Sequence, residues 1–270
     1  MRELTVDEIK ARELAIMCKV REFCEERGLT YYLAYGTLIG AVRHGGFIPW
    51  DDDVDLIMFR GDYDILMREF NIGRSDALRA KCPENDPDYC HNMGKIVDES
   101  TVLIEKNRLR DRLGLYIDIF AFDYLPEDDA QRAKILRRQQ FLRDQYRRTN
   151  EDPNEQKNPV KRLALRANKL ALRLLPGNLL ARKMNDVAFG ATRGERTAIC
   201  GEMTSYMCRE GSIFRTEWFD ETFELPFEGE LFTAPKNYDV ILRQTYGDYM
   251  TLPPEEKRHL EHGFTVYQKD

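Results

Sequence analysis

The acidic run at residues 49–57 constrains the fold most, because it sets four carboxylates directly before an apolar stretch. If the run is a strand, Asp51, Asp53 and Asp55 share one face, since successive side chains alternate. Half-buried carboxylates so close together cost stability unless a cation neutralises them. Hard oxygen ligands suit Mg²⁺ or Mn²⁺, so the run predicts a divalent-metal site. The alternative, an acidic surface turn, is disfavoured by the apolar residues that follow.

The residues before the acids predict a site for phosphate. Residues 31–35 have the pattern of a short buried strand, Gly36 and Thr37 that of a turn, and residues 38–43 that of a helix. A glycine turn at a helix N-terminus presents backbone N–H groups to an anion. The Thr37 hydroxyl and the Arg43 guanidinium would add donors. Next to a metal strand, this arrangement predicts binding of a nucleoside diphosphate through the metal.

A third carboxylate is expected to complete the metal site. Asp118 is the single acid in the β-branched and aromatic stretch at residues 115–120, and a buried acid there needs a partner. An edge-strand acid that faces solvent is the alternative. Asp123 is expected in a loop. Lys95 begins another predicted strand and could reach a phosphate, although a solvated lysine fits equally well.

Two segments resemble a known family. Residues 35–55, YGTLIGAVRHGGFIPWDDDVD, are similar to the LicD family of phosphotransferases, which belongs to the nucleotidyltransferase superfamily and is related to the fukutin group. Residues 232–235 and 246–254 are similar to the same family, so the resemblance spans nearly the whole chain. The resemblance implies transfer of a phosphorylated small group, most often phosphocholine from a CDP-linked donor such as CDP-choline. The acceptor would be a hydroxyl of a cell-surface glycan, such as lipopolysaccharide or teichoic acid, or of its lipid-linked precursor.

The resemblance also implies roles for individual residues. The paired aspartates of the superfamily match Asp53 and Asp55, and the later strand acid matches Asp118, so these three are the expected catalytic and metal-binding residues. Asp51 would be an outer member. Asp118 would also accept the proton of the attacking hydroxyl. A choline group would require an aromatic cage, for which the chain offers Tyr31, Tyr32, Trp50, Tyr116 and Tyr249.

Two other functions stay open. A nucleotidyltransferase would use the same metal strand to move a nucleoside monophosphate to a small molecule or protein, and would release pyrophosphate. A non-catalytic nucleotide-binding module would keep the fold as a scaffold. The three intact carboxylates disfavour the second of these.

The charge distribution predicts a distinct basic region. Residues 132–183 hold fifteen Lys and Arg and four Asp and Glu, whereas the whole chain has a net charge of −6. Within it, residues 161–183 alternate leucines with basic residues and contain no acid, which predicts an amphipathic basic helix broken at Pro176 and Gly177. Such a helix could lie on an anionic membrane or bind an anionic glycan; the alternative is ordinary core packing of its leucines. Nucleic acid is not expected, because the acidic remainder would repel it and no reader motif is present.

The remaining pattern indicates an α/β (α+β) fold. We expect a nucleotidyltransferase-like mixed β-sheet core with an N-terminal helix at residues 1–125, a basic helical insertion at residues 126–195, and C-terminal strands and a helix at residues 196–270 that complete the substrate site. Thr5 and Glu8 form a predicted capping box. A membrane-spanning run and an export-signal pattern are both missing from the sequence, which favours a cytoplasmic enzyme that contacts the inner membrane face at most peripherally.

Overall fold

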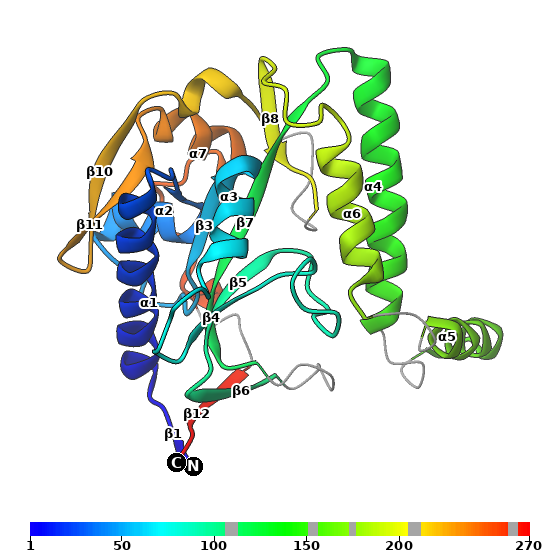
Figure 1. Cartoon of the computed structure of the whole chain (residues 1–270), viewed down its shortest axis with the longest axis horizontal. Helices are drawn as coiled ribbons and strands as arrows, with labels where there is room; N and C mark the ends of the chain where they lie inside the picture. Colours follow the sequence, from blue (N-terminus) through cyan, green and yellow to red (C-terminus); the bar gives the residue numbers. More distant parts are fainter. Residues whose placement is uncertain (106–112, 151–155, 173–176, 205–211, 259–263) are drawn as a thin grey trace.

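The computed structural model describes residues 1–105, 113–150, 156–172, 177–204, 212–258 and 264–270. A mixed β-sheet forms the centre, with helix α1 on one side and the helices of the insertion at the far end (Figure 1). The α+β fold expected from the sequence is confirmed.

The main sheet has seven strands, of which five follow the order β2-β3-β7-β5-β4. Its central pair, β3 and β7, is parallel, and the other pairings are antiparallel. Strand β8 pairs with the second half of β7, and β9 pairs with β8. The bounds are β2 Tyr32–Leu33, β3 Asp55–Phe59, β4 Leu78–Lys81, β5 Gly94–Asp98, β7 Leu115–Leu125, β8 Ile199–Glu202 and β9 Ile213–Arg215.

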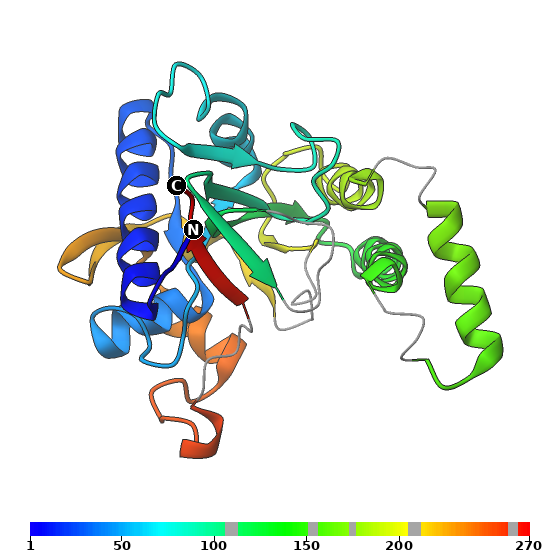
Figure 2. The same cartoon turned by 90° about the horizontal axis from the view of Figure 1, so that it is seen from below.

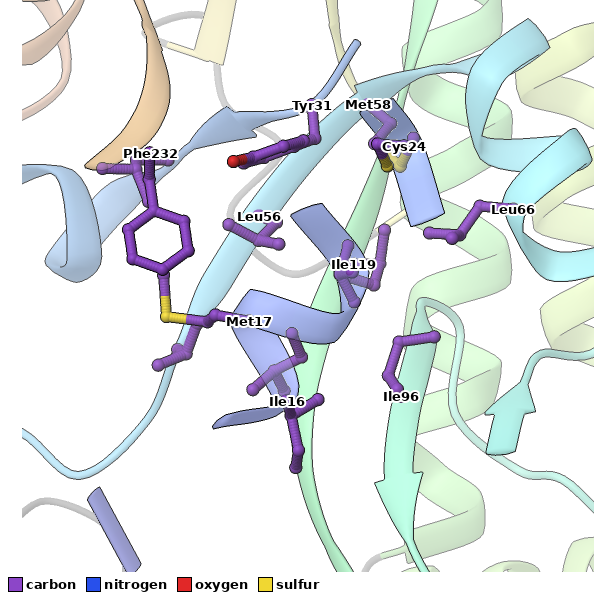
Figure 3. Packing of buried hydrophobic residues seen from close by; sticks show 14 of the residues in the cluster. Ile16, Met17, Cys24, Tyr31, Leu56, Met58, Leu66, Ile96, Ile119 and Phe232 are labelled. Carbon is purple, nitrogen blue, oxygen red and sulfur yellow. The ribbon is translucent and has the colours of Figure 1, made fainter. Parts of the chain in front are cut away.

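Helix α1 (Val6–Arg27) covers one face of this sheet. It begins at the predicted capping box, in which Glu8 N donates to Thr5 Oγ1 and Thr5 N donates to Glu8 Oε2. It ends at Gly28, whose φ of 65° is the left-handed conformation that glycine adopts without strain. The buried stripe of the helix packs on β3, β5 and β7 (Figure 3), and includes Ile16, Met17, Val20, Phe23 and Cys24.

Strand alternation gives the sheet two apolar faces. Leu56 and Met58 of β3 join the α1 cluster, whereas Ile57 joins an aromatic cluster on the opposite face with Phe120 and Phe122 of β7. Residues of equal parity on one strand point the same way. Asp55 and Asp118 therefore belong to the face of the aromatic cluster.

The insertion is helical, as its composition predicts. Helices α4 (Asp129–Asn150) and α6 (Leu179–Phe189) pack against each other beside the end of β7, and α5 (Pro159–Leu172) lies outside them (Figures 1 and 2). The predicted break falls between α5 and α6: Gly177 lies in the turn before α6, and Pro176 is outside the described residues. Helix α3 (Arg60–Glu69) follows β3 directly.

The C-terminal residues return to the start of the chain. A hairpin of β10 (Thr222–Phe227) and β11 (Glu230–Pro235) precedes α7 (Tyr238–Tyr246). A short 3₁₀ turn at Glu255–Lys257 follows α7 in the sequence and precedes β12 (Phe264–Gln268). Strand β12 is the middle strand of a second sheet, between β1 (Arg2–Glu3) and β6 (Thr101–Glu105), so the two chain ends lie side by side (Figure 1).

The expectation that Asp123 lies in a loop is wrong. Strand β7 continues to Leu125, because β8 pairs with its second half and places Gly201 opposite Asp123. Asp123 is buried, and both of its oxygens accept hydrogen bonds from Arg60 of α3. A buried carboxylate is stable there only because a guanidinium is buried with it.

Candidate active site

Three neighbouring strands bring two acids and a lysine into one row. Asp55 of β3 lies opposite Asp118 of β7, and Asp118 lies opposite Lys95 of β5. Side chains directly opposite on adjacent strands are about 5 Å apart. Lys95 is buried, its Nζ donates to Asp118 Oδ1, and it lies 3.3 Å from the centre of the Tyr116 ring. The sheet register thus brings Asp55, Asp118 and Lys95 together, although they are far apart in sequence.

The carboxyl of Asp55 is in an environment that disfavours its negative charge. Burial is the main cause that raises its pKa well above the usual range, and the nearby Asp53, Asp118 and Asp51 raise it further, whereas Lys95 lowers it. A cation beside Asp55 would offset this cost, since opposite charge stabilises the ionised form. The electrostatics of the row therefore fit a positively charged group.

The acidic run is not the strand that its alternation predicts. Strand β3 begins only at Asp55, and the chain turns just before, where Asp51 N donates to Ile48 O. On the other side of β3, the neighbouring β2 has only two residues and leads at once into α2 (Tyr35–His44), so β2 does not extend alongside the acidic run. Among the neighbouring carboxylates, Asp53 raises the pKa of Asp55 most, so the two acids remain close.

The Gly-Thr pair belongs to the first turn of α2 and not to a turn before it. Ala34 precedes the helix and provides no capping side chain. The Thr37 hydroxyl is buried and accepts a hydrogen bond of 2.9 Å from Asp55 N, so it fixes the start of β3. A Cβ on Gly36 would lie 2.5 Å from Asp51 Oδ2, so glycine allows that carboxylate to approach the helix N-terminus. In this structure the positive end of α2 faces Asp51.

Arg43 joins the first family-like segment to the second. Its Nη1 donates to Tyr249 O at 2.6 Å. Partial burial lowers its pKa, and the nearby Arg258 lowers it further. The Arg258 guanidinium lies 5.5 Å from the centre of the Trp50 ring, next to the acids in sequence. Two close cations repel each other and would gain from an anion between them. Sequence reasoning missed Arg258, since it lies more than 200 residues from Arg43.

Glu13 is a buried acid near Asp53 that sequence reasoning missed. It lies on the apolar stripe of α1 with 1% of its surface exposed, and its Oε2 has no hydrogen-bond partner among the residues that the structure describes. One turn earlier, Lys10 donates to Ile48 O and so connects α1 to the loop before the acids. Burial raises the pKa of Glu13 well above its usual range, and Asp53 raises it further. The available signal was a glutamate at a core position of an amphipathic helix.

Substituting Glu13→Gln is expected to stabilise the metal-free protein. A raised folded-state pKa means that the stability provided by Glu13 is complete below its ordinary pKa and is lost as the pH rises toward the folded-state value. Glutamine mimics the protonated form, so the melting temperature should rise by several degrees at pH 8 and by less at pH 5, given about 2–4 °C per kcal/mol for a chain this long. Thermal denaturation without metal measures this. Glu26→Gln, on the exposed side of α1, is the control. A lower melting temperature at both pH values would show that the ionised Glu13 is needed for the fold.

The five candidates for an aromatic cage differ in their surroundings. Tyr31 and Tyr32 are buried in the core, and the Tyr32 hydroxyl donates to Phe219 O. Trp50 and Tyr116 already have cationic side chains over their rings, Arg258 and Lys95 respectively. The Tyr249 hydroxyl donates to the Asp239 carboxylate. The surroundings of Tyr31 and Tyr32 argue for a structural role.

The acidic side chains of the site are of the chemical type that binds a divalent cation. Asp53, Asp55 and Asp118 provide hard oxygen ligands, the set that Mg²⁺ and Mn²⁺ prefer. In the conformation described, Asp118 contacts Lys95, and no three His, Cys, Asp or Glu side chains of the described residues converge closely enough to enclose a metal ion. Binding would therefore require side-chain rotation among these acids.

The acids at the start of β3 and on β7 thus lie on adjacent strands of a mixed sheet. The profile described as LicD/FKTN/FKRP, nucleotidyltransferase domain, matches residues 28–170, which include Asp55, Asp118 and Lys95. The chain belongs to this family.

Two relatives show the range of the family. The chain is 27% identical to the lipopolysaccharide cholinephosphotransferase LicD of Haemophilus influenzae, over 97% of both proteins. It is also 35% identical to the ribitol 5-phosphate transferase FKRP of Mus musculus, over 30% of this chain and 13% of that protein. One similarity extends from end to end, and the other covers a single segment. Both relatives are named for transferring a phosphate-containing group.

Proposed function

We propose that the protein transfers phosphocholine from CDP-choline to a hydroxyl of a cell-surface glycan or of its lipid-linked precursor, with Mg²⁺ or Mn²⁺ as cofactor. The observation that carries the proposal is the row of Asp55, Asp118 and Lys95 in a chain similar along its whole length to a lipopolysaccharide cholinephosphotransferase. As part of this proposal we place the reaction in the cytoplasm.

In this proposal, different residues bind the metal ion and the phosphates. A divalent cation held by Asp53, Asp55 and Asp118 would offset the charge of the donor diphosphate. Arg43 and Arg258 would bind the phosphates, together with the N-terminus of α2 at Gly36 and Thr37.

Asp118 takes the proton of the acceptor hydroxyl as its oxygen bonds to the phosphorus of the phosphocholine group. The bond from that phosphorus to the bridging oxygen breaks, and cytidine monophosphate leaves. Lys95, which donates to Asp118 Oδ1, holds the carboxylate in place.

Nucleotidyl transfer is the second candidate, because the same carboxylates serve both reactions. The products separate the two: pyrophosphate would appear from a nucleoside triphosphate in nucleotidyl transfer, and cytidine monophosphate from CDP-choline in phosphocholine transfer. The similarity to LicD over 97% of the chain favours phosphocholine transfer.

Incubation with Mg²⁺, lipopolysaccharide and CDP-linked donors tests the proposal. We expect acceptor-dependent release of cytidine monophosphate, fastest with CDP-choline compared with the ethanolamine, glycerol and ribitol donors, and loss of release with EDTA. Chromatography of the nucleotides and mass spectrometry of the glycan measure the two products. Faster release from CDP-ribitol would reassign the transferred group, and pyrophosphate from CTP without release from any CDP-linked donor would favour nucleotidyl transfer.

A further inference from the structure

Helix α5 stands apart from the rest of the molecule. In both views it lies at the outer edge, beyond α4 and α6 and far from the central sheet (Figures 1 and 2). Its main neighbour is α4. The side chain of Leu165 is buried, so one edge of α5 is covered by protein. The opposite side is available to a partner.

That opposite side carries a stripe of exposed apolar residues. Val160, Leu163 and Leu170 are 75%, 70% and 65% exposed, among the highest values for large apolar side chains in the described residues. With Ala167 they are spaced at i, i+3, i+7 and i+10, which places them on one face of the helix. Isolated exposed apolar residues are ordinary, but an aligned stripe on a protruding helix marks a binding surface.

Cations flank the stripe. Lys161, Arg162 and Arg166 are exposed on α5, and the helix contains no acid. The acid-free stretch extends over residues 156–185, in a chain whose net charge is −6. An apolar face bordered by Lys and Arg is the arrangement of helices that lie in the interface of an anionic bilayer. The charge of α5 is complementary to such a surface and opposite to that of the rest of the chain.

We propose that α5 binds the surface of an anionic phospholipid bilayer and lies in the plane of the interface. Val160, Leu163 and Leu170 insert below the headgroups, while Lys161, Arg162 and Arg166 contact lipid phosphates. A helix of 14 residues is about 21 Å long, shorter than the roughly 30 Å hydrocarbon core, so it lies on the membrane and does not cross it. Among the described helices, none has the length and apolarity of a membrane span.

Other partners fit this surface less well. A second copy of the chain docked through α5 would bring two sets of cations together, and like charges repel. A single-stranded nucleic acid would use aromatic side chains for stacking, and α5 contains none. A bilayer satisfies the apolar stripe and the cations at once.

Vesicle sedimentation with the full-length chain tests the proposal. We expect the chain to bind vesicles of 70% phosphatidylcholine and 30% phosphatidylglycerol at least ~10-fold more tightly than pure phosphatidylcholine vesicles, and less tightly in 0.5 M NaCl. The double variant Leu163→Asp/Leu170→Asp should lose at least ~10-fold of the binding to anionic vesicles. It should keep the wild-type melting temperature, since both side chains are exposed.

Ile72→Asp is the matched control, because Ile72 is 72% exposed and lies outside α5. It should bind anionic vesicles as the wild type does. The proposal is overturned if the wild type ignores anionic vesicles, if it binds neutral vesicles equally well, or if the double variant binds unchanged. A dimer in solution that the double variant converts to a monomer would assign the stripe to a second copy. None of these measurements depends on catalysis, so the proposed function can fail independently.

Discussion

Asp55→Asn is expected to lower turnover at least ~1,000-fold while the protein stays folded. Asp55 is the half-buried acid at the start of β3, close to Asp53 and opposite Asp118. Electrostatic stabilisation of a reacting phosphate group contributes several kcal/mol, and each 1.36 kcal/mol is a factor of ten in rate. Asparagine keeps the shape and the backbone hydrogen bonds but removes the charge that would hold the cation.

The loss of activity should come with unchanged or higher stability. Since the pKa of Asp55 is raised in the folded state, its ionised form costs stability above its ordinary pKa, and asparagine removes that cost. Nucleotide release and thermal denaturation without metal measure the two effects. Asp62→Asn is the control, since Asp62 lies on α3 and accepts from Thr30 N. More than a tenth of the wild-type rate in Asp55→Asn, still dependent on Mg²⁺, would refute the assigned role.

Arg60→Met is expected to destabilise the protein by about 3–5 kcal/mol, the usual effect of removing one partner of a buried ion pair. Arg60 Nε and Nη2 donate to the two oxygens of Asp123 at 2.9 and 2.7 Å, and both side chains are buried. Nη2 also reaches Asn185 of α6, so the pair joins α3, β7 and the helical insertion. The melting temperature should fall on the order of 10 °C.

A second substitution separates loss of the pair from loss of packing. Arg60→Met/Asp123→Leu should recover most of the stability, because it leaves no unpaired buried charge. Arg68→Met is the surface control, since Arg68 pairs with Glu69 in solvent and should change stability by less than ~1 kcal/mol. If Arg60→Met melts within 2 °C of the wild type, the pair does not hold the insertion to the sheet.

Local sequence signals predicted several helices and strands, whereas the arrangement of the site depends on pairing between strands that are distant in the sequence. The capping box at Thr5 and the strand around Asp118 needed only neighbouring residues, and both are present. The strand predicted for Asp51 and Asp53 is wrong: β3 begins only at Asp55, and the adjacent β2 ends at Leu33. Side-chain alternation states which face a residue would take, but not whether a partner strand exists.

The same difference between local and long-range information applies to the site residues. The row of Asp55, Asp118 and Lys95 depends on the order β3-β7-β5, which no local pattern contains. Asp123 was assigned to a loop because its partner Arg60 is distant in sequence. Glu13 was detectable, since a glutamate within an apolar helical stripe contradicts its surroundings, and such conflicts are concentrated at functional sites.

The place of β12 also determines when the newly made chain can finish folding. Because β12 lies between β1 and β6, neither ladder of that sheet can form until residues 264–268 have been translated. At about 5–20 residues per second, β1 waits on the order of 10–50 s on the ribosome. During that time Leu4 and Leu103 lack their apolar partner Val266. The nascent chain thus exposes apolar side chains that the folded protein buries.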